Sequence, residues 1–362
     1  MHFNTLLKTY TTLLPWNLAR RNLFISMILG LMSSGSVQQH KMAIGVSGSA
    51  TQSSVCARIR AFLRDFTFDF ADISKALITI SELRGLFELA IDRTNWKFGR
   101  TDINLLVLAL VIKGRFAIPL FWKALDKQGN SNSEERIDLL GQFIKVFGIE
   151  KIGALTADRE FIGQAWIDFL IQKSIPFYIR IKDNRLMNVT DLKGFTFPVK
   201  ALFEHLKTGQ KHHVSYALDG HPLYFAGTRS KDGDLVIIMS NQNKGLEILN
   251  IYRKRWTIEL MFKHCKQNGF NLEDTHLRHL DRIEKLLAVV ASALLLCFKA
   301  GEREEKKKPT PYKKTVSAPA FCTFRRGFDF LRKLLCSSKK KAIKLLASLI
   351  PTPQNMTPFL CN

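Results

Sequence analysis

Cysteine is scarce in this 362-residue chain, and its six cysteines show neither a C-x-x-C pair nor a regular spacing. They are Cys56, Cys265, Cys297, Cys322, Cys336 and Cys361. Disulfide frameworks and zinc fingers both need paired spacings, and the neighbours His264, Cys265, His276 and His279 lack the finger pattern. We therefore expect reduced thiols in a cytoplasmic protein.

Long apolar segments are also missing. The runs at residues 22–32 and 286–298 fall short of the roughly 20 residues that a membrane span needs, so we expect both to be buried core helices, with no membrane partner. There is no G-x-x-x-x-G-K-[ST] phosphate loop, and residues 45–49 fail the G-x-S-x-G pattern at the last position. These absences argue against P-loop nucleotide hydrolases and against serine hydrolases of the nucleophile-elbow type.

Acidic residues are few, and none precedes Asp65. Lys and Arg number 54 against 31 Asp and Glu, which gives a net charge of +23 and a pI near 9.9. A charge this far from neutral predicts a polyanionic partner that presents phosphates. The hydrophobic content of 46% indicates a globular chain.

The first 85 residues are predicted to form a helical domain, with breaks at residues 33–36 and 45–50 where small residues favour turns. A short helix, a glycine turn and a helix at residues 51–66 with Arg58, Arg60 and Arg64 would suit a contact of the helix-turn-helix kind with DNA. A helical packing domain with solvated arginines is the alternative.

Residues 86–184 have the texture of an α/β domain with a mixed sheet. Strands are expected at residues 86–92, 103–114, 115–125, 151–158 and 176–183, and helices at 131–148 and 165–174. The first helix would begin at Ser131 or Ser133 and stop at Gly148.

The second half of the chain alternates less regularly. We expect a β-rich insertion at residues 185–240, a helical segment at 241–301 and a basic C-terminal tail at 302–362. Within that tail, residues 324–335 read as a basic helix, residues 306–314 as a phosphate-binding linker or a solubilising charge run, and residues 351–362 as disordered.

One stretch, YRKRWTIELMFKHCK at residues 252–266, places a lone glutamate among cations. On a continuous helix, offsets of three, seven and fourteen fall within roughly 60° of one another, so Tyr252, Arg255, Glu259 and Lys266 would share a face. The opposite face, with Ile251, Trp256, Leu260 and Phe262, is expected to pack on the core.

A carboxylate in that setting has two explanations. Glu259 could form a surface ion pair one helical turn away, or it could bind a divalent metal while the cations bind nucleic-acid phosphates. A metal site needs further acids, and Asp92 and Asp158 each follow an apolar run that we expect to end as a strand. Strand ends are common positions for sites, although either residue could simply be a turn former.

The chain resembles the DDE transposases of bacterial insertion sequences, of the family-four type. That family has the signature Y-(2)-R-(3)-E-(6)-K, which is matched at Tyr252, Arg255, Glu259 and Lys266. Residues 92–99 resemble the block around the first Asp of the family, and residues 157–161 resemble the block around the second.

The resemblance implies a ribonuclease-H-like core interrupted by the β-rich insertion. It implies that Asp92, Asp158 and Glu259 bind two Mg²⁺ ions, with Mn²⁺ as a substitute, for DNA cleavage at transposon ends and strand transfer. Tyr252, Arg255 and Lys266 would contact DNA phosphates, with Asn95, Trp96 and Arg159 in support. The partners would be terminal inverted repeats, target DNA and a second copy of the chain in a synaptic dimer.

The sequence departs from relatives that use a hairpin intermediate, because the insertion has no tryptophan to stack a flipped base. Tyr216, Tyr224 or Phe225 could take that place. Two other functions use the same residues: a metal-dependent nuclease without joining activity, and a non-catalytic DNA-binding descendant of a transposase.

Overall fold

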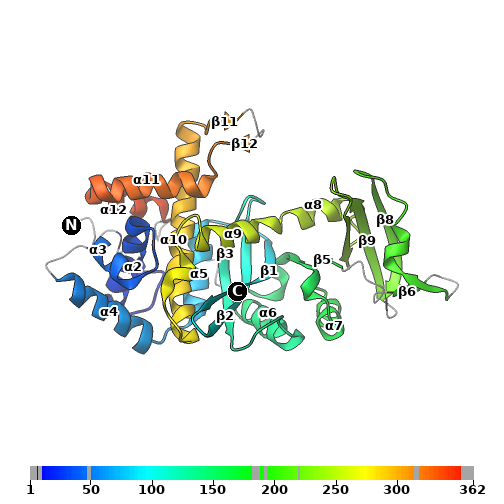
Figure 1. The fold of residues 1–362 in the computed structure, drawn as a ribbon, viewed down its shortest axis with the longest axis horizontal. Coiled ribbons are helices and arrows are strands. Elements are labelled where there is room, and N and C mark those ends of the chain that lie inside the picture. The colour runs from blue at the N-terminus through cyan, green and yellow to red at the C-terminus, as the bar shows by residue number, and fades with distance from the viewer. Residues whose placement is uncertain are drawn as a thin grey trace.

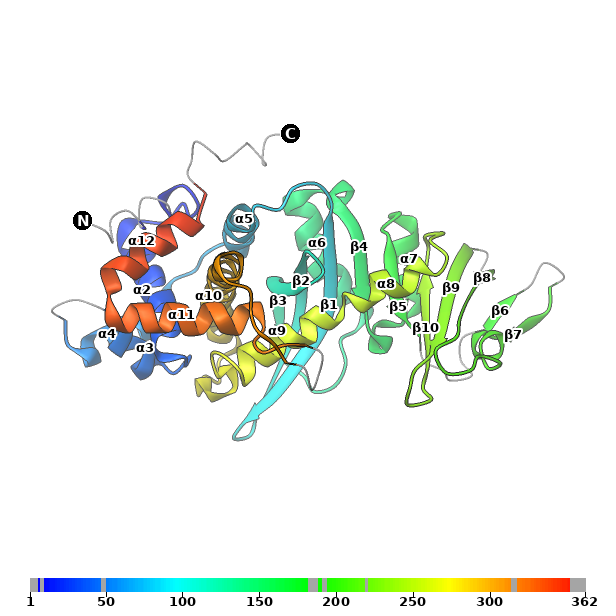
Figure 2. The ribbon, with the colours of Figure 1, turned by 90° about the horizontal axis from the view of Figure 1, so that it is seen from above.

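The computed structural model describes residues 6, 10–46, 50–181, 188–190, 194–218, 221–313 and 318–351. Figures 1 and 2 show an elongated molecule, in which helices from both ends of the chain gather at one end and the strands of residues 211–229 lie at the other. A mixed sheet with helices on both sides connects the two ends. The predicted disorder at residues 351–362 falls, apart from Pro351, outside the described residues.

The N-terminal part is helical, as predicted. Its helices are α2 (Leu18–Ser34), α3 (Gln39–Gly45), α4 (Gln52–Asp65) and α5 (Phe70–Ser81). Helix α2 ends at Gly35 in the left-handed conformation, and Thr51 caps α4 by accepting the N–H of Ser54, so both expected breaks occur. Apolar side chains of this part join the same core as the rest of the chain.

The central strands are β1 (Phe87–Phe98), β2 (Thr101–Ile112), β3 (Phe116–Leu125), β4 (Ile152–Ala157) and β5 (Phe177–Arg180). They lie in the order β3-β2-β1-β4-β5, antiparallel from β1 to β3 and parallel from β1 through β4 to β5. The expected mixed sheet is therefore present. One boundary was wrong: β1 does not end at Asp92 but continues to Phe98, because its distal half pairs with β2 in a hairpin.

Two helices follow on one side of these strands, namely α6 (Ser133–Phe147) and α7 (Gln164–Gln172). The cap of α6 is Asn132, not Ser131 or Ser133. Asn132 accepts the N–H of Glu135, and Glu135 in turn accepts the N–H of Asn132, which forms a capping box. The predicted stop at Gly148 is observed.

The segment expected as a β-rich insertion contains β6 (Asn188–Thr190), β7 (Thr196–Pro198), β8 (Lys211–Leu218), β9 (His221–Arg229) and β10 (Leu235–Ser240). These strands do not form a separate sheet. Strand β10 pairs antiparallel with β5, so one sheet of ten strands runs from β3 to β7.

The signature stretch is not one continuous helix, contrary to the prediction. Helix α8 (Glu247–Arg253) ends and α9 (Trp256–Lys266) begins around Lys254 and Arg255, where the N–H groups bond three residues back, as in a 3₁₀ turn. The predicted core face was also wrong, because Trp256 and Leu260 lie on the side of α9 opposite its buried residues. Trp256 is 57% exposed and Leu260 37% exposed.

The buried side chains of α9 include Ile258, Met261 and Cys265 instead, at offsets of three and seven. Ile251 and Phe262, also expected to face the core, are partly buried.

The last helices are α10 (Leu280–Lys307), α11 (Thr323–Ser337) and α12 (Lys339–Leu349), with a hairpin of β11 (Tyr312–Lys313) and β12 (Ala318–Pro319) between them. The predicted basic tail is thus mostly folded: α12 buries Ala342, Ile343 and Leu346, an apolar spacing that the sequence already contains.

The apolar runs at residues 22–32 and 286–298 lie within α2 and α10 and are largely buried, as expected. Among the described residues, the structure has no helix with the length and apolar character required to cross a membrane.

Candidate active site

Two of the predicted acids lie next to each other in the sheet. The parallel pairing of β1 with β4 ends at Ile91 opposite Ala157. Asp92 is the next residue after Ile91, and Asp158 is the next residue after Ala157. Each carboxylate accepts the following backbone N–H, from Arg93 or Arg159, at 2.7 Å. The positions at which the parallel ladder ends therefore present both acids at one edge, which is where α/β sheets commonly form sites.

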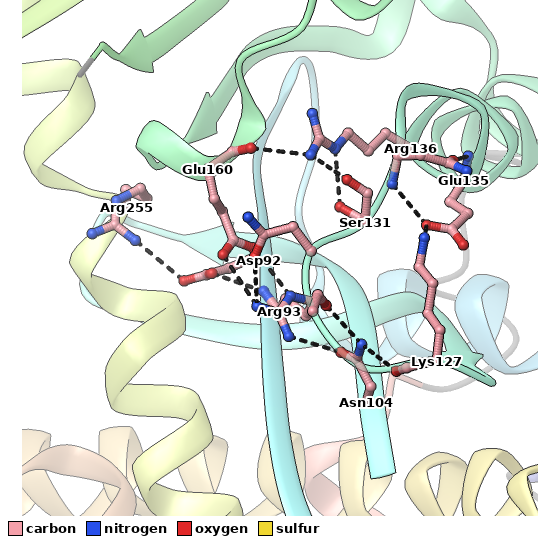
Figure 3. Close-up of polar contacts among 12 residues, drawn as sticks. Asp92, Arg93, Asn104, Lys127, Ser131, Glu135, Arg136, Glu160 and Arg255 are labelled. Carbon is pink, nitrogen blue, oxygen red and sulfur yellow. Dashed lines mark hydrogen bonds and ion pairs between the residues drawn. The ribbon is translucent and has the colours of Figure 1, made fainter. Parts of the chain in front are cut away.

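Arg255 joins these acids to the third. Its NH1 group lies 3.2 Å from Oδ2 of Asp92, its NH2 group donates to Glu259, and its Nε donates to the Tyr252 hydroxyl at 3.1 Å. That hydroxyl donates in turn to Oδ1 of Asp158 at 3.4 Å. Figure 3 shows Arg255 reaching from the helix toward Asp92 on the strand. Five of the predicted site residues thus meet in one network: Asp92, Asp158, Tyr252, Arg255 and Glu259.

Burial dominates the electrostatics of this network. It raises the pKa of Asp92 to about 7, against the opposing effects of the Arg93 N–H and the Arg255 charge. It also raises the pKa of Tyr252 to about 12. Burial alone would lower the pKa of Arg255, but Tyr252 and the three carboxylates raise it above the ordinary value. Arg255, only 8% exposed, is therefore a permanent cation within an acidic cluster.

A second network, which sequence reasoning missed, lies beside Asp92 and Asp158. Arg93 donates to both carboxylate oxygens of Glu160 at 3.3 Å, and its guanidinium also donates to Asn104 and Asn130. Arg136 on α6 donates to the backbone carbonyl of Glu160 at 3.0 Å (Figure 3). The only sequence signal is that Arg93 and Glu160 lie within two positions of the predicted acids, since the pairing spans 67 positions.

Lys266, predicted to bind DNA, makes contacts within the protein. Its Nζ donates to the backbone carbonyl of Asn95 at 2.8 Å, pairs with Glu273 at 2.8 Å and lies 5.4 Å from the centre of the Trp96 ring. These contacts link α9 to the distal half of β1, so Asn95 and Trp96 support Lys266 and not the acids directly.

A cation-rich cavity adjoins the acid network. It measures about 390 Å³ and lies between the outer strands of the sheet and the α8–α9 junction. Four cations line it, and none of the described residues in its lining is acidic. The lining includes Arg180, Lys211, Arg253, Arg255, Tyr252 and Trp256. Arg180 and Lys211 were not among the predicted site residues, because only the fold brings their strands to the signature stretch. Arg253 was also missed, because it lies within that stretch but outside the four signature positions.

A divalent cation would need suitable donor atoms and a close grouping of the acids. Carboxylate oxygens are the donors that Mg²⁺ prefers, so the donor chemistry fits. The geometry does not: across the described part of the chain, no three His, Cys, Asp or Glu side chains are grouped so that they could hold a metal. The guanidinium of Arg255 contacts both Asp92 and Glu259. A cation held by these two carboxylates would therefore lie close to the guanidinium charge.

The arginines predicted on the N-terminal helix lie on α4 and take no part in the contacts of the acid network. Arg60 and Arg64 are about 40° apart around the helix, while Arg58 is about 160° from Arg60. Arg64 pairs with Asp65 at 2.7 Å, and Arg60 donates to Gln39. The helix pair α3 and α4 matches the expected elements, and its contact with DNA stays a prediction.

The family described as "Transposase DDE domain" has a sequence model that matches residues 88–296, a segment that includes Asp92, Asp158 and Glu259. No curated protein matches the sequence. The chain is similar to a piggyBac transposase, solved by cryo-electron microscopy as a synaptic complex with hairpin DNA. The TM-score is 0.42 at 12% identity, and the similarity covers 93% of this chain and 77% of that chain.

Proposed function

The chain belongs to the family of transposase DDE domains, and from this premise we propose that it cuts DNA at the ends of a mobile element and joins those ends to target DNA. One observation carries the proposal: Arg255 contacts Asp92 and Glu259, is connected to Asp158 through the Tyr252 hydroxyl, and also lines a cavity rich in cations. Such a cavity suits the phosphates of a DNA strand next to a group of carboxylates that can act on them.

The proposed reaction has two steps. Water adds to a phosphodiester at the element's end and frees a 3′-hydroxyl, with the proton and the 5′-phosphate as the other products. That hydroxyl then attacks a target phosphodiester and displaces its 3′-oxygen, so one bond forms as another breaks. We propose two Mg²⁺ ions as the cofactor, or Mn²⁺ in their place, held by Asp92, Asp158 and Glu259 after a rearrangement. When bound, such ions would stabilise charge on the reacting oxygens.

DNA contacts form the next part of the proposal. Tyr252 and Arg255 are proposed to bind phosphates at the cavity, together with Arg180 and Lys211 from the sheet. Lys266 is proposed to bind a phosphate as well. Arg58, Arg60 and Arg64 on α4 are proposed to contact the element's end farther from the acids.

The organisation that we propose follows the same family. The order β3-β2-β1-β4-β5, with three antiparallel strands followed by two parallel ones, supports a ribonuclease-H-like core at residues 86–184 and 241–301. Residues 185–240 would be its insertion, residues 1–85 a DNA-binding domain and residues 302–362 a basic extension. We propose that the protein works in the cytoplasm on the nucleoid, as a homodimer that brings two inverted repeats together.

The test is cleavage and joining of labelled duplexes that carry the inverted repeats flanking the gene, with Mg²⁺ or Mn²⁺. The intact chain should nick the ends and join them to target DNA. Glu259→Gln, which removes a charge and keeps the shape, should bind the repeats and do neither. Cleavage without joining would identify a nuclease instead. Equal cutting by both proteins would remove Glu259 from the chemistry.

A further inference from the structure

One side chain belongs to both the acid network and the cavity. Arg255 donates to Asp92, Glu259 and Tyr252 and also lines the cation-rich cavity. Through the Tyr252 hydroxyl it is connected to Asp158 as well. From this double placement we propose that Arg255 blocks the divalent-cation site until a DNA phosphate in the cavity draws its guanidinium away from the carboxylates. The proposal rests on the function proposed above and adds an order to it, DNA first and cation second.

Competition follows from the identity of the contacts. A divalent cation held by Asp92 and Glu259 would meet carboxylates that each already use one oxygen to accept a hydrogen bond from Arg255. The two cations would also repel each other strongly at such short range, because the guanidinium is only 8% exposed and little water screens it. Arg255 and the cation therefore compete for the same two carboxylates.

A DNA phosphate is the group that can change this balance. A guanidinium binds a phosphate with two parallel hydrogen bonds, as it binds a carboxylate, so the exchange costs Arg255 little. The cavity attracts a phosphate through Arg180, Lys211 and Arg253, and Arg255 already forms part of its wall. The phosphate therefore arrives beside the residue that it must displace.

Glu160 is a further acid beside Asp92, and its carboxylate is already engaged elsewhere. Both of its carboxylate oxygens accept from Arg93, which Asn104 and Asn130 hold in place. The carboxylates that Arg255 would release are thus those of Asp92, Glu259 and, through Tyr252, Asp158.

Linkage makes the inference measurable. If DNA and Mn²⁺ both bind only the state in which Arg255 is withdrawn, each ligand must raise the affinity of the protein for the other. Mn²⁺ binding to the full-length protein is therefore measured by calorimetry, alone and with an excess of the repeat-bearing duplex. The same duplex with neutral methylphosphonates at its terminal linkages serves as the control for phosphate charge.

We expect the duplex to tighten Mn²⁺ binding to the wild-type protein by about tenfold or more, and the methylphosphonate duplex to have little effect. Arg255→Met, which keeps the length of the side chain but removes the donors, should bind Mn²⁺ about tenfold more tightly than wild type without DNA. The duplex should then add nothing. Glu259→Gln should bind Mn²⁺ weakly in every condition.

If Arg255→Met binds Mn²⁺ more weakly than wild type, the guanidinium organises the acids instead of blocking them. If the variant does not fold, the comparison of charged and neutral duplexes on wild type still decides: equal Mn²⁺ affinity with both overturns the inference. If DNA cleavage depends on Glu259 but DNA does not change the affinity for Mn²⁺, the proposed function stands and only the blocking role of Arg255 is overturned.

Discussion

The Arg93 guanidinium donates to both oxygens of the Glu160 carboxylate, at 3.3 Å each, and so ties β1 to the turn that follows β4. The side chains are 14% and 24% exposed, which places the pair between a surface ion pair and a buried one. Asp92 precedes Arg93 in β1, and Asp158 lies two positions before Glu160, so the pair joins the two segments that carry these acids.

Glu160→Ala should lower the free energy of unfolding by about 2 kcal/mol, because Arg93 then keeps its burial but loses its ionic partner. Urea denaturation of the full chain measures the change. The matched control is Asp138→Asn, which removes the exposed partner of Lys123 and should cost less than about 0.5 kcal/mol. Equal losses in the two variants would mean that the Arg93 pair adds nothing beyond a surface contact.

Helices α10 and α11 cross so closely that a side chain would not fit at Gly327. A Cβ atom there would lie 1.8 Å from the carbonyl oxygen of Cys297, which is backbone and cannot rotate away. Gly327→Ala should therefore destabilise the protein by about 3 kcal/mol in thermal or urea unfolding.

Gly141→Ala on α6 is the control for this substitution, since a Cβ at Gly141 has nothing within 4 Å. That variant should gain about 0.5–1 kcal/mol from the better helix propensity of alanine. A neutral Gly327→Ala would show that the two helices can move apart without loss.

His264 should make the protein sensitive to mild acid. Burial lowers its pKa to about 4, so the unfolded chain binds a proton between pH 6.5 and pH 4 that the folded chain does not. Stability therefore falls as the pH falls through this window, by up to about 3 kcal/mol from this residue. The ring stacks on Phe324 with centroids 4.4 Å apart, which links α9 to α11.

Urea denaturation of wild type and His264→Gln at pH 7 and pH 4 tests this expectation. The variant should lose less stability on acidification than wild type does. His40→Gln, at an exposed position, should behave as wild type. Parallel losses in all three proteins would assign the acid sensitivity to other groups.

The cavity cations should contribute separately to DNA binding. Neutralising one phosphate contact lowers the dependence of log affinity on log salt by about one unit, so Arg180→Gln and Lys211→Gln should each reduce the slope by about that amount. Fluorescence anisotropy over a salt series measures the slope. Lys173→Gln, at the C-terminal cap of α7, should leave the slope unchanged, because α7 and α8 lie on opposite sides of the sheet (Figure 1). An unchanged slope in the cavity variants would place the DNA elsewhere.

The amino-acid sequence by itself determined most of the secondary structure and named residues that the fold brings together. Apolar runs predicted each central strand, glycine and small residues predicted the helix breaks, and the spacing of Tyr252, Arg255 and Glu259 predicted one local cluster. Patterns of this kind are local, so they are visible without the fold. The long apolar runs also predicted core helices correctly, because a helix without charged side chains can be buried on all sides.

Only the tertiary structure decided what depends on partners far along the chain. The extension of β1 past Asp92 requires β2, and the joining of the outer strands to the central sheet requires the pairing of β10 with β5. The ion pair of Arg93 with Glu160 and the cavity between Arg180 and Arg255 join segments more than 60 positions apart. The pair of Arg255 with Glu259 is local and was one of the alternatives that the sequence left open, but the contact of Arg255 with Asp92 spans 163 positions and required the fold. A buried carboxylate is stable beside such a cation because the pair offsets the cost of burying its charge.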